Sequence, residues 1–157
     1  MRRADSSMNR KKGQSDMRPN RFCAMLAAGL LMAAAMPLPA AAVDMPPLAV
    51  QWYAALQTAD RNAFLKLMAQ DAKIDLRQLD IVQSRDEFIE SLDNWEDVVK
   101  DAKIETKPVS GDPANAVVDV CYRFPSNQRL NRETFVFAGT VIARQTQELI
   151  AENCDGF

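Results

Sequence analysis

Apolar positions in residues 48–59 recur at steps of three and four, which predicts an amphipathic helix. The stripe consists of Leu48, Trp52, Ala55, Leu56 and Ala59. Asp60 is a suitable N-cap for a second, short helix, which we expect to end at Asp71-Ala72. Ser84 and Glu87 have the spacing of a capping box, which predicts the start of a third helix. The apolar positions of that helix are Phe88, Ile89, Leu92, Trp95 and Val99.

Polar and apolar residues alternate in most of the remaining sequence, which predicts strands. Two short strands are expected before the third helix, at 73–76 and 79–83. After Lys100 the period is two, and strands are expected at 102–106, 116–124, 133–137 and 140–150. Helices followed by consecutive strands indicate an α+β fold, with about three helices packed on one face of a curved antiparallel sheet.

The first 42 residues have the pattern of an export signal. Seven Arg and Lys residues precede an apolar run at 22–36, Pro37-Leu38-Pro39 ends the run, and Ala40-Ala41-Ala42 supplies an A-x-A cleavage site. The run is shorter than the roughly 20 residues that a membrane-spanning helix needs. We therefore expect residues 1–42 to be a cleavable signal peptide and 43–157 to be a single periplasmic or secreted domain, without a membrane span after cleavage.

A second methionine, Met17, begins a more ordinary signal sequence of its own. Residues 1–16 are accordingly expected to be an upstream extension that is disordered.

Charge is unevenly divided between the signal and the rest of the chain. The leader holds 7 of the 19 basic and 2 of the 21 acidic residues, so residues 43–157 carry 12 basic and 19 acidic residues, a net charge of −7. An acidic surface repels nucleic acid and anionic membranes, which disfavours both as partners.

Histidine is absent from the sequence. This excludes Ser-His-Asp and Cys-His catalytic groups and the usual zinc sites. We expect neither a metal nor another cofactor, and any general base would be Asp, Glu, Tyr or Lys.

Cys121 and Cys154 are the two cysteines that follow the leader, and an even count in an exported chain suggests a disulfide. Two unpaired thiols are the alternative. Hairpin turns near Asn127 and Gly139 would place Cys121 opposite Thr134, and Thr134 opposite Arg144. Cys154 would then lie about 33 Å further along an extended chain, whereas a disulfide needs Cα atoms within about 7 Å. A bond therefore requires the chain to curl back after Arg144, and both alternatives remain open.

The sequence resembles the nuclear-transport-factor-2-like (NTF2-like) superfamily, which includes ketosteroid isomerases and SnoaL-like polyketide cyclases. The similar features are the first-helix segment 48–60 with its Ala59-Asp60 junction, the D-A-x-I-x strand at Asp71 to Asp75, the capping-box helix and the closing hairpin. The resemblance covers residues 47–150. It implies that the sheet curls around the helices into a cone with an apolar pocket at its open end.

The resemblance also implies candidate catalytic residues. Ketosteroid isomerases hold an oxyanion with a tyrosine and a protonated Asp, and use a second Asp as the base. Tyr53 matches the tyrosine, and aligning Phe135-Val136-Phe137 with the family's F-x-F strand places Glu133 at the protonated Asp. Leu76 occupies the position of the base, and Asp75 beside it would face the other side of the strand.

Cyclase and dehydratase relatives place Asp or His in the pocket. Without histidine the candidates are Asp75, Asp80 and Asp119, although their apolar neighbours favour a solvated outer face. The acidic residues of the third helix lack the spacing of a calcium loop and indicate a solvated helix face.

Because the base is displaced, the first hypothesis is an exported NTF2-like domain that binds a small apolar or amphipathic ligand, or a protein partner. The expected pocket residues are Trp52, Tyr53, Leu56, Trp95 and Phe135, although the same spacing would also fill a core. The second hypothesis is an isomerase, dehydratase or cyclase that uses Tyr53 with Glu133 or Asp75. The third hypothesis is a purely protein-binding module, which could form a homodimer through the sheet.

Overall fold

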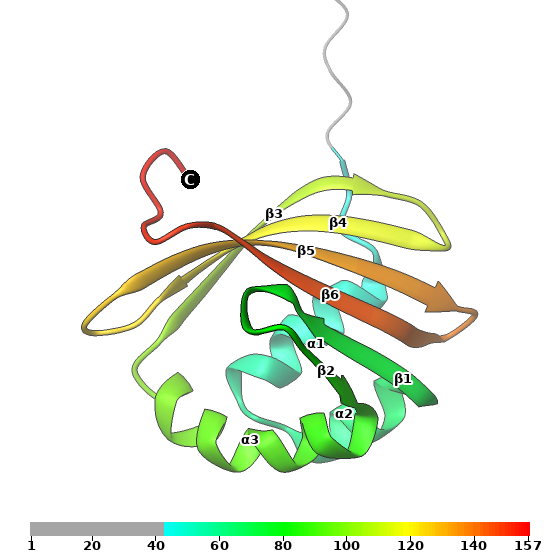
Figure 1. The fold of residues 1–157 in the computed structure, drawn as a ribbon. Helices are drawn as coiled ribbons and strands as arrows, with labels where there is room; N and C mark the ends of the chain where they lie inside the picture. Colours follow the sequence, from blue (N-terminus) through cyan, green and yellow to red (C-terminus); the bar gives the residue numbers. More distant parts are fainter. Residues whose placement is uncertain (1–42) are drawn as a thin grey trace, which may run out of the picture. The chain divides into compact units, whose positions relative to one another are not determined.

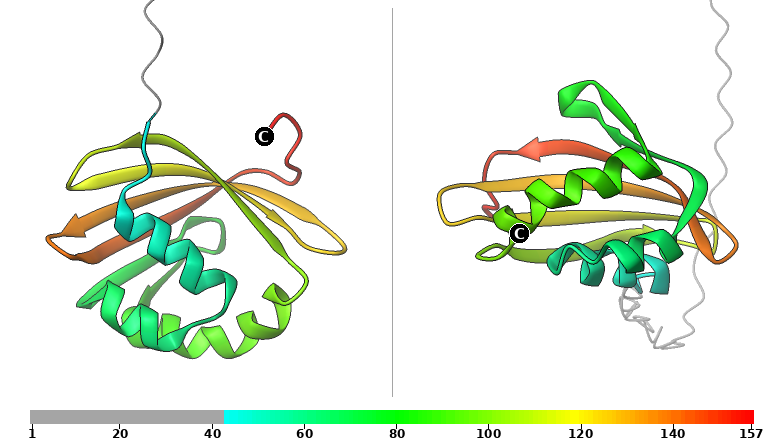
Figure 2. Two further views of the ribbon diagram at one scale, coloured as in Figure 1. Left: turned by 180° about the vertical axis from the view of Figure 1, so that it is seen from behind. Right: turned by 90° about the horizontal axis from the view of Figure 1, so that it is seen from below.

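The computed structural model describes residues 43–157, and the signal peptide and upstream extension expected in residues 1–42 lie outside them. Three helices cover one face of a curved six-stranded sheet (Figures 1 and 2). The helices are α1 Pro47–Gln57, α2 Arg61–Leu67 and α3 Arg85–Val99. The strands are β1 Met68–Leu76, β2 Ile81–Ser84, β3 Lys103–Gly111, β4 Asn115–Arg123, β5 Gln128–Ala138 and β6 Val141–Ala151.

Each helix begins where its local chemistry predicts. Pro47 occupies the first turn of α1, where its missing N–H would have no intrahelical partner in any case. The Asp60 carboxylate caps α2 by accepting from the Ala63 N–H at 3.0 Å. Ser84 and Glu87 form the predicted capping box, in which the Ser84 N–H donates to Glu87 Oε2 at 2.7 Å.

The sheet is mixed, with the strand order β2-β1-β6-β5-β4-β3. The last four strands in sequence pair antiparallel, as predicted, and β1 pairs antiparallel with β2. The expectation of an entirely antiparallel sheet was wrong at one pair, because β1 and β6 run parallel. In the sequence, α3 and four other strands separate β1 from β6. Local alternation does not specify which distant strands become neighbours.

Two boundaries near β1 differ from the prediction. The second helix ends at Leu67, and the chain is already extended at Met68, which pairs with Ile142 of β6. The strand expected at 79–83 begins instead at Ile81, after a single 3₁₀ turn, η1, at Arg77–Leu79. In both places tertiary pairing to the sheet overrides a weak local preference.

A single apolar cluster fills the space between the helices and the concave face of the sheet. At its centre Trp52 stacks on Phe88 with ring centroids 5.2 Å apart, and meets Phe64 and Phe135 edge-on at 4.8 and 5.7 Å. Such aromatic pairs contribute about 0.5–1.5 kcal/mol each beyond the burial of their area. The helix stripe and strand β5 are thereby joined into one core.

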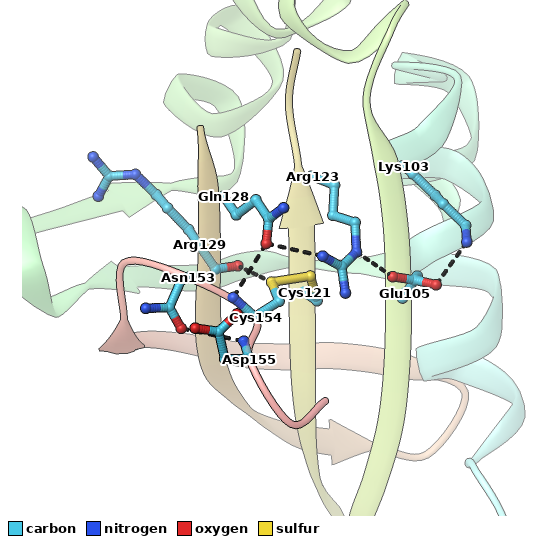
Figure 3. The surroundings of a disulfide bond; sticks show 9 residues. All are labelled: Lys103, Glu105, Cys121, Arg123, Gln128, Arg129, Asn153, Cys154 and Asp155. Carbon is cyan, nitrogen blue, oxygen red and sulfur yellow. Dashed lines mark hydrogen bonds and ion pairs between the residues drawn. A yellow bond between two sulfur atoms is a disulfide. The ribbon is translucent and has the colours of Figure 1, made fainter. Parts of the chain in front are cut away.

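Cys121 and Cys154 form a disulfide, with their Cα atoms 5.8 Å apart (Figure 3). The expected register was wrong, because the β4–β5 turn places Cys121 opposite Leu130 rather than Thr134. Leu130 in turn pairs with Ala151, so Cys154 lies only three residues beyond the end of the ladder. The chain bends there, and the Cys154 N–H donates to Gln128 Oε1 at 3.3 Å.

None of the helices within residues 43–157 combines the length and apolar character that a membrane crossing needs. The same part of the chain contains no group of three or more Cys, Asp or Glu side chains placed to hold a metal ion.

Candidate functional site

A cavity of about 540 Å³ opens between α1, α3 and the concave face of strands β1, β4, β5 and β6. Its apolar lining consists of Trp52, Leu56, Ile74, Leu76, Leu79, Phe88, Leu92, Trp95, Val98, Tyr122 and Phe124. Its polar lining consists of Gln78, Gln83, Ser91, Asn94, Arg129, Asn131, Glu133, Gln145 and Gln147. A wider depression of about 870 Å³ runs along α1 and α2, but its charged residues, Asp60, Lys66 and Asp112, are all exposed. The cavity is therefore the candidate site, because it contains a buried ionisable group.

That buried group is Glu133 on β5, whose side chain is 1% exposed. Three side chains from three other elements donate hydrogen bonds to it. The Tyr53 hydroxyl, from α1, donates to Oε2 at 3.0 Å. The Tyr122 hydroxyl, from β4, donates to Oε1 at 2.5 Å, and Gln147 Nε2, from β6, donates to the same oxygen at 3.1 Å. Tyr53 and Glu133, which the family resemblance selected together, thus converge.

Burial raises the pKa of Glu133 above the ordinary value for a glutamate, although its hydroxyl and amide donors act in the opposite direction. Burial also raises the pKa values of Tyr53 and Tyr122 well above the usual range, and the neighbouring Glu133 charge adds to this effect. Both tyrosines therefore remain protonated donors at neutral pH. Glu133 retains a proton more readily than an exposed glutamate does.

Two amide side chains flank Glu133. Asn131 and Gln145 are each 3% exposed, and within residues 43–157 neither Asn131 Oδ1 nor Gln145 Oε1 has a hydrogen-bond partner. A buried carbonyl oxygen without a partner costs about 1–3 kcal/mol. We call Asn131, Glu133 and Gln145 the acceptor floor of the cavity. The Trp52 indole N–H is also buried without a partner among these residues.

Side chains alternate between the two faces of each strand, and this alternation decides which residues form the acceptor floor. Asn131 and Glu133 share the inward face of β5 with Phe135, and Gln147 lies opposite Glu133 in β6. Gln145 lies opposite Phe135 in the same ladder. Our reading of the sequence missed Asn131, Gln145, Gln147 and Tyr122. The sequence did contain a signal for the residues on β5. Residues 131, 133, 135 and 137 fall on the same face of a strand, so the apolar Phe135 and Phe137 indicate that Asn131 and Glu133 also face inward.

The expected pocket residues divide into two groups. Trp52, Leu56 and Trp95 line the cavity. Tyr53 and Phe135 are instead buried in the adjacent core, where their rings meet edge-on with centroids 5.9 Å apart. Of Tyr53, only the hydroxyl reaches the site, through Glu133.

The aspartate candidates lie away from the cavity. Asp75 stands between Ile74 and Leu76, whose side chains line the cavity, so its own side chain lies on the opposite face of β1. Asp80 is exposed at the end of η1. Asp119 pairs with Arg132 on the outer face of the sheet. Among these candidates none can therefore exchange a proton with a molecule held beside Glu133.

The sequence matches no protein-family model, and no curated protein matches it significantly. Solved structures do match. An NTF-2-like protein of unknown function from Burkholderia xenovorans is 14% identical, with 65% of this chain and 79% of that chain covered and a TM-score of 0.56. IdmH from Streptomyces antibioticus, provisionally assigned as a polyketide cyclase, is 10% identical over 66% of this chain and 89% of its own, with a TM-score of 0.59.

A hypothetical protein from Catenulispora acidiphila with a ketosteroid isomerase-like fold, solved in complex with trimethylamine, is 12% identical. The match covers 67% of this chain and 86% of that one, with a TM-score of 0.54. Helices enclosed by a curved sheet, together with these likenesses, define an α+β protein of the NTF2-like fold. The chain has the fold of the NTF2-like superfamily, as the family resemblance in the sequence implied.

Proposed function

We propose that this domain binds a small amphipathic ligand, whose apolar body lies against the aromatic walls of the cavity and whose polar end reaches the acceptor floor. The observation that carries the proposal is the incomplete pairing of the floor. Asn131 and Gln145 are buried beside Glu133, and their carbonyl oxygens have no partner within the described residues. A fold retains such groups at a cost to its stability, and a ligand with matching donors would offset that cost.

The dimensions of the cavity support the same proposal. Small-molecule sites are clefts of about 300–1,000 Å³ with mostly apolar walls and a few convergent polar groups. The cavity volume of about 540 Å³ falls within that range. Trp52 and Trp95, the two tryptophans of the chain, both line it.

Intrinsic tryptophan fluorescence therefore provides a direct test. We expect members of a panel of lipophilic amines, alcohols, ketones and acids to change the emission and to raise the melting temperature. Leu76→Trp, which places a large side chain in the cavity wall, should abolish the rise in melting temperature. The matched control is Val82→Trp on β2, where the side chain is 58% exposed and outside the cavity lining. A panel without effect on the unmodified chain would overturn the proposal.

A second candidate function is proton transfer in an isomerase-, dehydratase- or cyclase-type reaction, favoured by the 3.0 Å contact between Tyr53 and Glu133. Burial raises the pKa of Glu133 above its ordinary value, which is the direction that a carboxylic acid acting as a proton donor requires. One solved protein of similar fold is provisionally assigned as a polyketide cyclase. Glu133→Gln separates the candidates, since an enzyme would lose turnover while a neutral ligand would still bind.

We also propose that residues 1–42 direct export and that the binding domain acts outside the cytoplasm. The Cys121–Cys154 disulfide supports this location, because disulfides persist in oxidising compartments. N-terminal sequencing of the exported protein should begin at Val43 or a neighbouring residue. A mature protein that begins at Met1 would contradict the proposal.

A further inference from the structure

We propose that the ligand of the cavity carries a positively charged amine at its inserted end, which pairs with Glu133 and donates N–H bonds to Asn131 and Gln145. This inference rests on the proposed function that the cavity binds a small ligand, and it names the chemical class of that ligand. It is carried by the balance of donors and acceptors at the floor, by the aromatic walls and by the distribution of charge.

Three donors that meet at the floor are already engaged. The Tyr53 and Tyr122 hydroxyls and the Gln147 amide all donate to Glu133. The fully buried side-chain atoms left without partners among the described residues are two acceptors, Asn131 Oδ1 and Gln145 Oε1, and one donor, the Trp52 indole N–H. A primary ammonium group offers three N–H donors and no acceptor. It therefore matches the two free acceptors and the carboxylate, whereas a carboxylate or ketone would bring a further acceptor to them.

Five aromatic side chains line the cavity: Trp52, Phe88, Trp95, Tyr122 and Phe124. Trp95 meets Tyr122 and Phe124 edge-on at centroid distances of 6.0 Å, and Trp52 stacks on Phe88. Aromatic faces attract an organic cation by about 0.5–1 kcal/mol at exposed sites, and more where the cation is desolvated. The walls thus favour the same charge as the floor.

The charges of the domain agree with this polarity. Residues 43–157 carry a net charge of −7, from 12 basic and 19 acidic residues, which attracts cations. Arg129 is the one basic residue in the cavity lining. It is exposed and stands four residues from Glu133 along β5, about 13 Å in an extended strand. It is closer to Asn131, two residues away on the same face, but its exposed charge is screened by solvent and lies more than a Debye length from Glu133 along the strand.

Binding of a cation would also draw the proton from Glu133. Burial holds its pKa above the ordinary value, and a positive charge in contact favours the ionised form. At a pH below the pKa that Glu133 has in the free domain, we therefore expect amine binding to release protons, which makes the observed enthalpy depend on the ionisation enthalpy of the buffer. A neutral ligand should show a much smaller dependence.

The test is calorimetric titration of the full-length chain with three probes that share one skeleton: 4-phenylbutylamine, 4-phenylbutan-1-ol and 4-phenylbutanoate. We expect the amine to bind at least about tenfold more tightly than the alcohol, and the acid most weakly. Equal binding of the three, or tightest binding of the acid, would overturn this inference and leave the proposed function standing. No binding of these probes or of the wider lipophilic panel would overturn the proposed function, and this inference with it.

Substitutions test whether the acceptor floor causes the preference for the amine over the alcohol. Glu133→Gln should remove the advantage of the amine over the alcohol, and Asn131→Leu should reduce it in part. Asp119→Asn makes the corresponding change on the outer face of β4 and should leave the advantage intact. If Glu133→Gln fails to fold, Asn131→Leu and the buffer dependence still decide the inference. An undiminished amine preference in Asn131→Leu, without proton release, would contradict it.

Discussion

The two faces of strands β4 and β5 hold polar groups under opposite conditions. On the outer face, Arg132 contacts both carboxylate oxygens of Asp119, at 2.8 and 2.9 Å, and Arg123 pairs with Glu105 at 2.6 Å. Figure 3 shows that second pair beside the disulfide. On the inner face, one residue along β5 from Arg132, Glu133 is buried within a floor whose amide oxygens lack partners among the described residues. The outer groups are those of an ordinary solvated surface, whereas the inner ones cost stability, a cost that the proposed ligand would offset.

The largest single effect is expected from the covalent link on the outer face. The disulfide joins residues 33 apart in sequence, and a loop of that size stabilises the folded state by about 3–4 kcal/mol through the unfolded chain. The paired change Cys121→Ser with Cys154→Ser should lower the free energy of unfolding by this amount in urea titrations.

Reductant provides the control for that experiment. It should destabilise the unmodified chain by a similar amount and leave the double variant unchanged. An unmodified chain whose unfolding midpoint does not respond to reductant would show that the bond contributes nothing.

The buried Glu133 on the inner face should make the free energy of unfolding depend on pH. The raised pKa of Glu133 means that the folded state binds its proton more tightly than the unfolded state, whose value is near 4.5. Its stabilising contribution is therefore complete below that pH and is lost as pH rises through the folded pKa. Relative to Glu133→Gln, the unmodified chain should lose up to about 1.4 kcal/mol per pH unit within this window.

Comparing the unmodified chain with Glu133→Gln cancels the contributions that the exposed carboxylates make to the pH dependence of stability. Glu87, Glu105 and Asp112 have lowered pKa values from hydrogen bonds or ion pairs, and their contributions are lost as pH falls. Both proteins share these groups. A stability difference between the two that is constant from pH 4 to 8 would show that Glu133 is not perturbed in the folded state.

The sequence predicted the elements better than their pairing. Capping at Asp60 and Ser84 depends on residues within one turn, so local reasoning located both helices. The parallel pairing of β1 with β6 and the register of Cys121 depend on which distant strands meet, which no local pattern specifies.

For the same reason, only part of the candidate site could be predicted from the sequence. The family resemblance selected Tyr53 and Glu133 together, and the structure joins them by a hydrogen bond. The rest of the floor depends on β5 pairing with β6 in one register, which brings Gln147 opposite Glu133. Asn131 and Gln145 look like ordinary solvated amides until that register buries them.

If the unpartnered amides are retained for a ligand, replacing one should strengthen the fold. Asn131→Leu removes a buried carbonyl oxygen that has no partner within the described residues and puts a similar volume in its place. We expect the free energy of unfolding to rise by about 1 kcal/mol in urea titrations, while amine binding weakens. The matched change Thr134→Val on the outer face of β5 should stay within about 0.5 kcal/mol. A loss of stability in Asn131→Leu would indicate that the amide supports the fold rather than a ligand.

The smallest effect is expected at Asp119, where the outer face can be tested with the chemistry used at Glu133. Asp119→Asn neutralises a carboxylate whose side chain is 19% exposed and whose partner, Arg132, is 48% exposed. A solvated pair of this kind contributes about 0.2–1 kcal/mol, and added salt screens it. We expect a loss of about 0.5 kcal/mol in low salt that shrinks in 1 M NaCl, with no change in ligand binding. A loss as large as the pH-dependent effect of Glu133, or one that salt does not reduce, would mean that the two faces do not differ in the way their burial indicates.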